Sequence, residues 1–165
     1  MNGHDYDVLI IGGGVAGLAC ASLLRNLLRG RREPLRIAVL EARAPRQPAA
    51  DAGPGLRVFA IAPAGRAILE ACGGWNGLPP GMASPYERMR VWQSGSTPFG
   101  AGSIGFDAAE SGGSDLGHIV DHDWLRLGLW NTLLEPRGGE VHLLTGSSPA
   151  GLEAGPGATT VRLAD

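Results

Sequence analysis

The stretch Tyr6–Leu18, YDVLIIGGGVAGL, decides the fold. Its first half, Val8–Ile11, is a short run of bulky apolar residues, which is typical of a strand buried in a parallel sheet. Its second half has the pattern G-x-G-x-x-G at Gly12, Gly14 and Gly17. In a βαβ unit the first glycine permits a sharp turn, the second lets the backbone approach a pyrophosphate, and the third lets the helix pack close to the strand. The stretch therefore predicts a strand, a phosphate-binding turn and the start of a helix.

The residues that follow fit the same unit. The span 18–28 contains five leucines and neither Gly nor Pro, and Arg29-Gly30 is a helix stop signal. A second apolar run, 35–40, ends at Glu41, which comes 24 residues after the last glycine of the motif. An acidic residue near this separation accepts hydrogen bonds from an adenosine ribose. These features predict dinucleotide binding, with the phosphates at the helix N-terminus formed by Val15 and Ala16. A glycine-rich turn in an ordinary βαβ unit is the alternative.

Length and composition limit the possible functions. A chain of 165 residues is one domain in size and short for a cofactor enzyme with a separate substrate domain. A net charge of −2 without a basic stripe argues against a nucleic-acid partner. The mean hydropathy of +0.02 indicates a globular domain with long loops. No apolar run approaches 18 residues and no leader precedes the first strand, so we expect a cytoplasmic protein, with peripheral contact to the inner membrane left open.

The middle of the chain predicts one helix and an antiparallel pair of strands. Prolines mark a loop over 42–55, and Pro63 suits the first turn of a helix that runs to about Cys72. We expect Ala67, Ile68 and Ala71 to face inward on that helix. Residues 75–85 are expected to be a connection without regular structure. Two alternating stretches, 88–93 and 102–109, predict a hairpin, so that residues 88–110 would belong to a second layer or a substrate sheet.

The last third predicts a helix followed by strands. After a brief extended piece at 118–120, Asp121 or Asp123 is expected to cap a helix that ends at Leu134. Its inward stripe should be Leu125, Leu129 and Leu133, widened by Trp130 and Leu134. A strand at 140–144 follows. The run 159–163 is expected to be one arm of a hairpin whose other arm lies beyond residue 165.

The polar residues give no sign of a metal site or a catalytic pair. The three candidate histidines, 118, 122 and 142, do not share a helical face, and Cys20 and Cys72 are expected to be reduced thiols. No nucleophile is paired with a base, and no P-loop lysine is present. We therefore expect no catalytic side chain and no metal ligand.

Four stretches resemble one family, the FAD-dependent hydroxylases of ubiquinone biosynthesis within the class A flavoprotein monooxygenases. They are YDVLIIGGGVAGL, LRVFAIAPAGRAILEACGGW, PYERMRVWQ with GSIGFDAAE, and LGHIVDHDWLRLGLW. The similarity runs across most of residues 5–144. The phrase SIGFDAAE followed by LGHIV is more specific than the glycine motif.

The resemblance implies a Rossmann-like α/β FAD-binding fold, with a parallel sheet and an antiparallel excursion. It also implies that a nicotinamide cofactor, NAD(P)H, reduces the FAD, and that the reduced flavin and O2 then hydroxylate an aromatic, polyprenylated phenol. Partners among other ubiquinone-biosynthesis proteins are a further expectation. The cofactor-binding residues expected on this basis are Gly12, Gly14, Val15, Ala16, Gly17, Glu41, Arg43, Arg57 and Arg126.

The sequence departs from the family pattern in two respects. Asp121-His122 stands where the family usually has Glu-Asn, and Arg126 stands where it usually has Gln facing the FAD. Arg126 is therefore expected to contact a phosphate, and Arg57 the flavin or pyrophosphate; solvated arginines are the alternative at both positions. The family's later Gly-Asp motifs are absent, so we expect an N-terminal portion that binds FAD weakly or not at all. An NAD(H)-binding reductase domain and a non-catalytic stub are the alternative functions.

Overall fold

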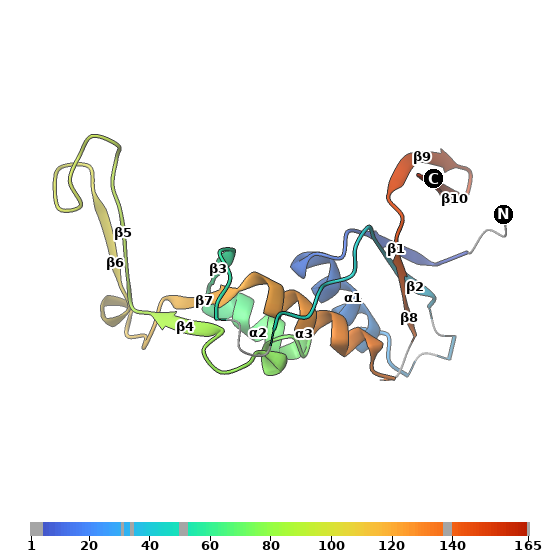
Figure 1. Ribbon diagram of the computed structural model, residues 1–165, viewed down its shortest axis with the longest axis horizontal. Coiled ribbons are helices and arrows are strands. Elements are labelled where there is room, and N and C mark those ends of the chain that lie inside the picture. Colours follow the sequence, from blue (N-terminus) through green and yellow to red (C-terminus); the bar gives the residue numbers. More distant parts are fainter. Residues whose placement is uncertain (1–4, 31, 34, 50–52, 137–139, 165) are drawn as a thin grey trace.

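The computed structural model describes residues 5–30, 32–33, 35–49, 53–136 and 140–164. The molecule is elongated (Figure 1), and the described residues form three α-helices and a parallel sheet in its body. A two-stranded ribbon, β5–β6, projects from one end, and a hairpin, β9–β10, lies at the other. The α/β fold with a parallel sheet and an antiparallel excursion, predicted from the sequence, is confirmed.

The parallel sheet has the strand order β1-β2-β8, with β1 at Val8–Ile11, β2 at Ile37–Glu41 and β8 at Val141–Thr145. All three strands run in the same direction, and β2 is central. The first four residues of β2 are fully buried, which explains their continuous apolar sequence. The predicted strands at 8–11, 35–40 and 140–144 are confirmed to within two residues.

Helices α1 (Val15–Leu27) and α3 (His122–Leu134) pack against each other, and residues of both join the sheet in one core. Helix α1 begins directly at the glycine turn, three residues earlier than the predicted span 18–28, because Gly14 takes the N-cap position. The buried side chain of Arg25 fastens α1 to the end of α3 by donating to the carbonyl oxygens of Leu133 and Glu135. These contacts hold the C-terminal part of α1 against the end of α3.

The N-terminus of α3 is fixed by Asp121. One carboxylate oxygen accepts from the backbone N–H groups of Asp123 and Trp124, both at 2.9 Å, so Asp121 is the cap residue. The other oxygen accepts from the N–H of Gly55 at 2.6 Å. The predicted inward stripe of Leu125, Leu129, Leu133 and Trp130 is buried, but the inclusion of Leu134 was wrong, since its side chain is 63% exposed.

A second sheet, order β3-β7-β4, is antiparallel and consists of β3 (Val58–Ile61), β7 (Gly117–Asp121) and β4 (Ala83–Tyr86). The prediction that residues 75–85 lack regular structure was wrong, because β4 begins within them and a 3₁₀ helix forms at Trp75–Gly77. Strand β4 lies at the edge of its sheet, where Pro85 is tolerated.

Helix α2 (Pro63–Ala71) begins with proline in its first turn, as predicted. Its inward face is a correction. Ala67, Ile68 and Ala71 are exposed, whereas Leu69 and Cys72 are buried. The short helix presents one narrow stripe to the core, and that stripe is displaced by one residue from the predicted one.

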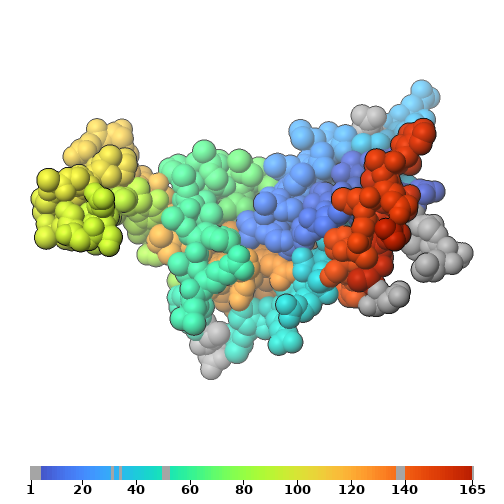
Figure 2. All heavy atoms as spheres, turned by 90° about the horizontal axis from the view of Figure 1, so that it is seen from above, coloured from blue at the N-terminus to red at the C-terminus, as the bar shows by residue number. Residues whose placement is uncertain are grey.

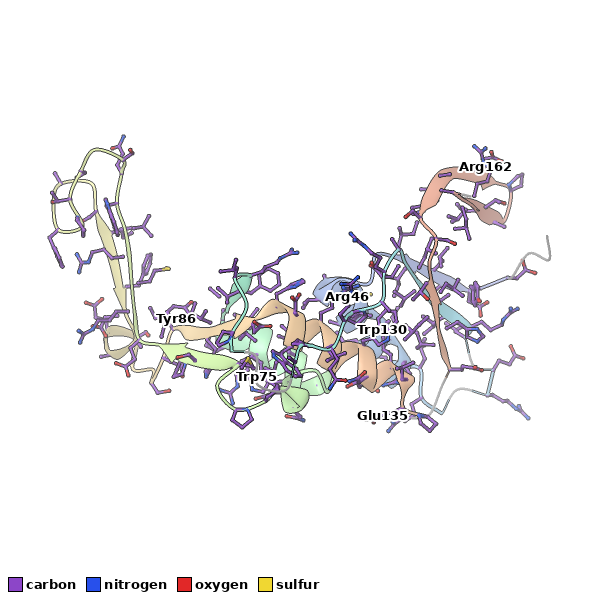
Figure 3. All side chains as sticks on the ribbon, in the orientation of Figure 1. Arg46, Trp75, Tyr86, Trp130, Glu135 and Arg162 are labelled. Atoms are coloured by element: carbon purple, nitrogen blue, oxygen red, sulfur yellow. The ribbon has the colours of Figure 1, made fainter. Side chains whose placement is uncertain are left out.

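The ribbon consists of β5 (Arg88–Val91) and β6 (Ile104–Asp107), paired antiparallel as predicted. Figure 2 shows it as a lobe that stands apart from the body. Figure 3 places Trp130 within the helical body and Tyr86 at the base of the β5–β6 ribbon. Many of its apolar side chains are exposed, among them Val91 at 51% and Phe99 at 82%.

The C-terminal hairpin corrects another prediction. The partner of β10 (Ala158–Leu163) is β9 (Pro149–Gly155), which precedes it, and not a strand beyond residue 165. Gly157 has φ 85°, so Pro156-Gly157 forms the tight turn between the strands. The alternation in β9 is weak because Ala and Gly occupy several of its positions, and the sequence therefore gave no strong strand signal there.

Candidate functional site

The candidate site lies where the parallel strands end. The register pairs Ile11 with Leu40 and Glu41 with Thr145, so the carboxyl ends of β1, β2 and β8 meet at one edge of the sheet. The N-terminus of α1 follows directly after β1 at this edge. In open α/β sheets, ligands bind outside the carboxyl ends of the strands.

The glycine turn has the geometry that its motif predicts. Gly12 has φ 108°, a backbone conformation that favours glycine, and its N–H donates to the carbonyl oxygen of Leu40 at 2.8 Å. A Cβ at Gly17 would lie 2.0 Å from the carbonyl oxygen of Gly12, so this glycine permits close packing of helix and strand. A Cβ at Gly14 would have no heavy atom within 4 Å, so the space in front of it is open. The turn thus leaves room for a ligand at the N-terminus of α1.

That N-terminus has the properties of an anion site. No side chain caps α1, and its first turn contains no acidic residue. Its first helical hydrogen bond runs from the N–H of Leu18 to Gly14, so the amides of Val15, Ala16 and Gly17 are the usual unpaired first-turn donors. Beside an open space, such donors are suited to phosphate oxygens.

Glu41 is held at the end of β2 by two backbone donors. The N–H of Gly13 donates to Oε2 at 2.6 Å, and the N–H of Arg43 donates to Oε1 at 3.1 Å. Burial alone would raise the pKa of Glu41, but these two hydrogen bonds and the guanidinium groups of Arg126 and Arg43 outweigh it, and the pKa lies below its usual value. The side chain is therefore an ionised acceptor at neutral pH.

Arg126, near the start of α3, reaches this same edge. Its Nε donates to the carbonyl oxygen of Gly13 at 2.7 Å, and its Nη2 donates to that of Arg43 at 2.6 Å. Nη2 also lies 3.3 Å from Oε1 of Glu41. The alternative of a solvated arginine at this position is wrong, because the side chain is only 18% exposed.

The structure brings together most of the residues expected to bind the cofactor: Gly12, Gly14, Val15, Ala16, Gly17, Glu41, Arg43 and Arg126. Arg57 is different. Its guanidinium lies 5.6 Å from the ring centre of Phe59, and its carbonyl oxygen accepts from His122 at the start of α3. These contacts do not join it to the glycine turn, so its role at a flavin stays a prediction.

Two residues of the site were missed by the sequence reasoning. Gly13 supplies the N–H that fixes Glu41, and a Cβ there would lie 2.9 Å from Cβ of Glu41. The G-x-G-x-x-G pattern leaves this position unspecified, although a third consecutive glycine was a usable signal. Thr145 is placed beside Glu41 by strand register, which no local pattern reveals.

The site is an open edge, and two hollows among the described residues lie elsewhere. One, of about 360 Å³, is lined by α3 residues such as Asn131, by Gln47 and by the segment 73–77. Figure 3 shows Arg46, next to Gln47, on the segment that crosses over α3. The other, of about 390 Å³, lies between α2 and residues 113–115. Neither contains a residue of the glycine turn.

The three histidines that the structure describes have separate surroundings. His118 contacts Arg66 and Trp75, His122 contacts Asp123, and His142 lies 3.5 Å from the hydroxyl oxygen of Tyr6. Within the described ranges no group of three or more His, Cys, Asp or Glu side chains is suited to a metal ion. The same ranges contain no helix long and apolar enough to cross a membrane.

Comparison with known proteins supports a nucleotide-binding fold. Residues 10–45 match the family model of the NAD(P)-binding Rossmann-like domain. The chain is 32% identical over 120 residues to the mitochondrial ubiquinone biosynthesis monooxygenase COQ6 of Xenopus tropicalis, an alignment that covers 72% of this chain and 24% of that protein. The chain therefore spans about a quarter of the length of this relative.

Two solved structures share the fold. PqsL of Pseudomonas aeruginosa, described as a probable FAD-dependent monooxygenase, is 21% identical with a TM-score of 0.60, covering 96% of this chain and 38% of PqsL. It has also been solved in complex with 2-aminobenzoylacetate. The p-nitrophenol 4-monooxygenase PnpA of Pseudomonas putida DLL-E4 is 19% identical with a TM-score of 0.62, covering 94% and 35% of the two chains. The resemblance to FAD-dependent hydroxylases that the sequence indicated is confirmed.

Proposed function

We propose that this chain is the N-terminal FAD-binding portion of an NAD(P)H- and O2-dependent flavin hydroxylase that acts on an aromatic ubiquinone precursor. The observation that carries the proposal is the ionised Glu41 carboxylate, fixed by Gly13 beside the open N-terminus of α1. A carboxylate at the end of β2 and free amides at the glycine turn are the two parts of an adenine-dinucleotide site. Similarity to COQ6 and to FAD-dependent monooxygenase folds favours FAD over other dinucleotides.

The residues present fit the adenosine and pyrophosphate parts of FAD. The open space at Gly14 is where the backbone would approach the pyrophosphate, and the amides of Val15 and Ala16 would donate to it. Glu41 offers about four acceptor positions, of which Gly13, Arg43 and Arg126 use three. The remaining position, on Oε2, is available to a ribose hydroxyl.

The bound flavin would supply the redox chemistry and the reaction with O2, and this chain would bind and orient its adenosine end. The described contacts place no acid–base pair at the site. Arg57 directly precedes β3, the edge strand of the second sheet on the side opposite β4. We propose that its side chain faces the flavin part of FAD. Its mutation should then change the flavin spectrum more than the affinity for an adenosine fragment.

The remaining assignments follow from the same proposal. Residues 88–110 would belong to the substrate sheet, since β5 and β6 form a sheet separate from the FAD-binding one. The substrate would be a small aromatic molecule, for which a polyprenylated phenol is the specific candidate, and other ubiquinone-biosynthesis proteins are candidate partners. We propose a cytoplasmic location, and peripheral contact to the inner membrane is left open.

A second candidate is an NAD(H)-binding reductase domain. The specific observation in its favour is the match of residues 10–45 to the NAD(P)-binding Rossmann-like domain. Glu41 suits NAD(H) as well, because both dinucleotides present the same adenosine ribose. A non-catalytic stub that keeps the fold is the third alternative.

Titration of the 165-residue chain separates these candidates. FAD, NADH and ADP-ribose are titrated by isothermal calorimetry, and FAD also by quenching of its fluorescence. The proposal expects weak binding of FAD and ADP-ribose, lost in Glu41→Ala. Binding of NADH without quenching of FAD fluorescence favours the reductase.

A further inference from the structure

Arg126 and Glu41 together hold two loops that are remote in the sequence. The first is the turn after β1, which contains Gly13, and the second is the loop after β2, which contains Arg43. Gly13 gives its N–H to Glu41 and its carbonyl oxygen to Arg126. Arg43 does the same, with its N–H on Glu41 and its carbonyl oxygen on Arg126. Each loop is thus bound at one residue by both halves of a single ion pair.

The three partners of Arg126 use two of its three guanidinium nitrogens. Nε serves one loop and Nη2 serves the other, with distances of 2.7 and 2.6 Å, while the ion pair with Glu41 is longer at 3.3 Å. Both side chains are about four-fifths buried, at 18% and 19% exposed, so water competes weakly for these contacts. The planar fork of a guanidinium can serve two carbonyl oxygens at once, which a lysine ammonium does not do with fixed geometry.

We propose that Arg126 is a positioning residue, which fixes Glu41 and the glycine turn in the arrangement that receives an adenosine ribose and pyrophosphate. It acts through Gly13, Arg43 and Glu41, which contact Nε or Nη2 of its guanidinium. The proposal rests on the proposed function, since it assigns the site its ligand. It differs from the phosphate contact expected of Arg126 from the sequence alone.

The first test measures, without any ligand, the clamp that Arg126 and Glu41 form on the two loops at Gly13 and Arg43. Amide hydrogen exchange of Gly13 and Arg43 is followed by NMR in the wild-type chain and in Arg126→Gln. Loss of charge-assisted hydrogen bonds should accelerate exchange at both amides about tenfold or more. The matched control is Arg88→Gln, which removes an exposed arginine paired with Asp107 on the ribbon and should leave both amides unchanged.

The second test measures the pKa of Glu41. Two guanidinium groups lie near its carboxylate: that of Arg126, which belongs to α3, and that of Arg43, in the loop after β2. The pKa of Glu41, followed by NMR of its carboxyl carbon, should be higher in Arg126→Gln than in the wild type. Arg126→Lys keeps the positive charge but lacks the planar guanidinium. In this variant the pKa of Glu41 should stay close to that of the wild type, while amide exchange at Gly13 and Arg43 should still accelerate. A merely structural role would not separate these two readouts.

The third test is affinity for FAD and ADP-ribose. Arg126→Gln should weaken both about tenfold, and Arg88→Gln neither. Unchanged exchange and titration in Arg126→Gln overturn the positioning role, as does weakening of FAD without weakening of ADP-ribose, which would point to a direct flavin contact. If the wild type binds neither ligand, the proposed function fails for this chain, while the exchange and titration measurements still decide whether the clamp exists.

Discussion

The two glycines that flank the start of α1 should respond in opposite ways to the addition of one methyl group. Gly17→Ala places a Cβ 2.0 Å from the carbonyl oxygen of Gly12 and 3.3 Å from Cγ2 of Ile10. Because the first contact is with backbone, α1 must move away from β1. Gly14→Ala adds its Cβ to open space, and φ −77° and ψ 178° at this position suit alanine.

The expected magnitudes follow from these contacts. Overpacking costs about 1–3 kcal/mol, and a clash with backbone belongs at the upper end. Alanine regains up to about 1 kcal/mol in helix propensity, so Gly17→Ala should lower the free energy of unfolding by about 2 kcal/mol. For a chain of 165 residues this corresponds to a Tm about 4–8 °C lower. Gly14→Ala replaces a favoured N-cap residue by a disfavoured one and should cost roughly 0.5–1 kcal/mol.

The assay is urea unfolding followed by tryptophan fluorescence, to which the buried Trp130 contributes, combined with ADP-ribose titration. Gly14→Ala should fold normally and lose ligand affinity, because its methyl group occupies the space proposed for the pyrophosphate. Equal stability of Gly17→Ala and the wild type would refute the close packing of α1 on the turn. Undiminished ligand affinity in Gly14→Ala would refute the placement of the pyrophosphate.

Three further predictions concern charge, capping and exposure. The pKa of Glu41 lies below its usual value of 4.5 in the folded chain, so its ionised form stabilises the fold above that pH. The difference in unfolding free energy between wild type and Glu41→Gln should therefore shrink as pH falls from about 7 to about 3, and a constant difference would contradict the assignment. Asp121→Ala should cost about 1–2 kcal/mol in urea unfolding, and the exposed Asp123→Ala much less, because only the former caps α3. Phe99→Ser should leave the free energy of unfolding almost unchanged in urea unfolding, since Phe99 is 82% exposed; a large loss of stability would contradict its exposure on the ribbon.

The sequence predicted the features that short segments determine. The strand before the glycines, a cap at Asp121 or Asp123 and the acidic end of β2 each depend on a few neighbouring residues. Each is found in the structure, with Asp121 as the cap. Strand β4 and strand β9 were missed because Pro85 and the small residues of 149–155 weaken the local strand signal, while pairing with β7 and β10 stabilises them.

The internal structure of the site could not be predicted in the same way. Arg126 contacts residues 113 and 83 positions away in the sequence, and the geometry depends on how α3 packs against α1 and the sheet. The sequence marked Arg126 as unusual because glutamine is common at that position in the resembling family. Its partners could not be inferred, because a guanidinium in that place has donors for either a phosphate or a carbonyl oxygen.

The engagement of Arg126 decides how an anion would be bound at this site. A move of its side chain onto a phosphate would leave the carbonyl oxygens of Gly13 and Arg43 without this donor and would remove the cation next to Glu41. Buried acceptors and an ionised carboxylate that lose a charged donor are costly, so a new phosphate contact would first have to offset those losses. The amides at the start of α1 donate to no capping side chain, and the open space at Gly14 lies directly beside them. The pyrophosphate is therefore expected to be bound by backbone, and the arginine to preserve the shape of the turn that presents it.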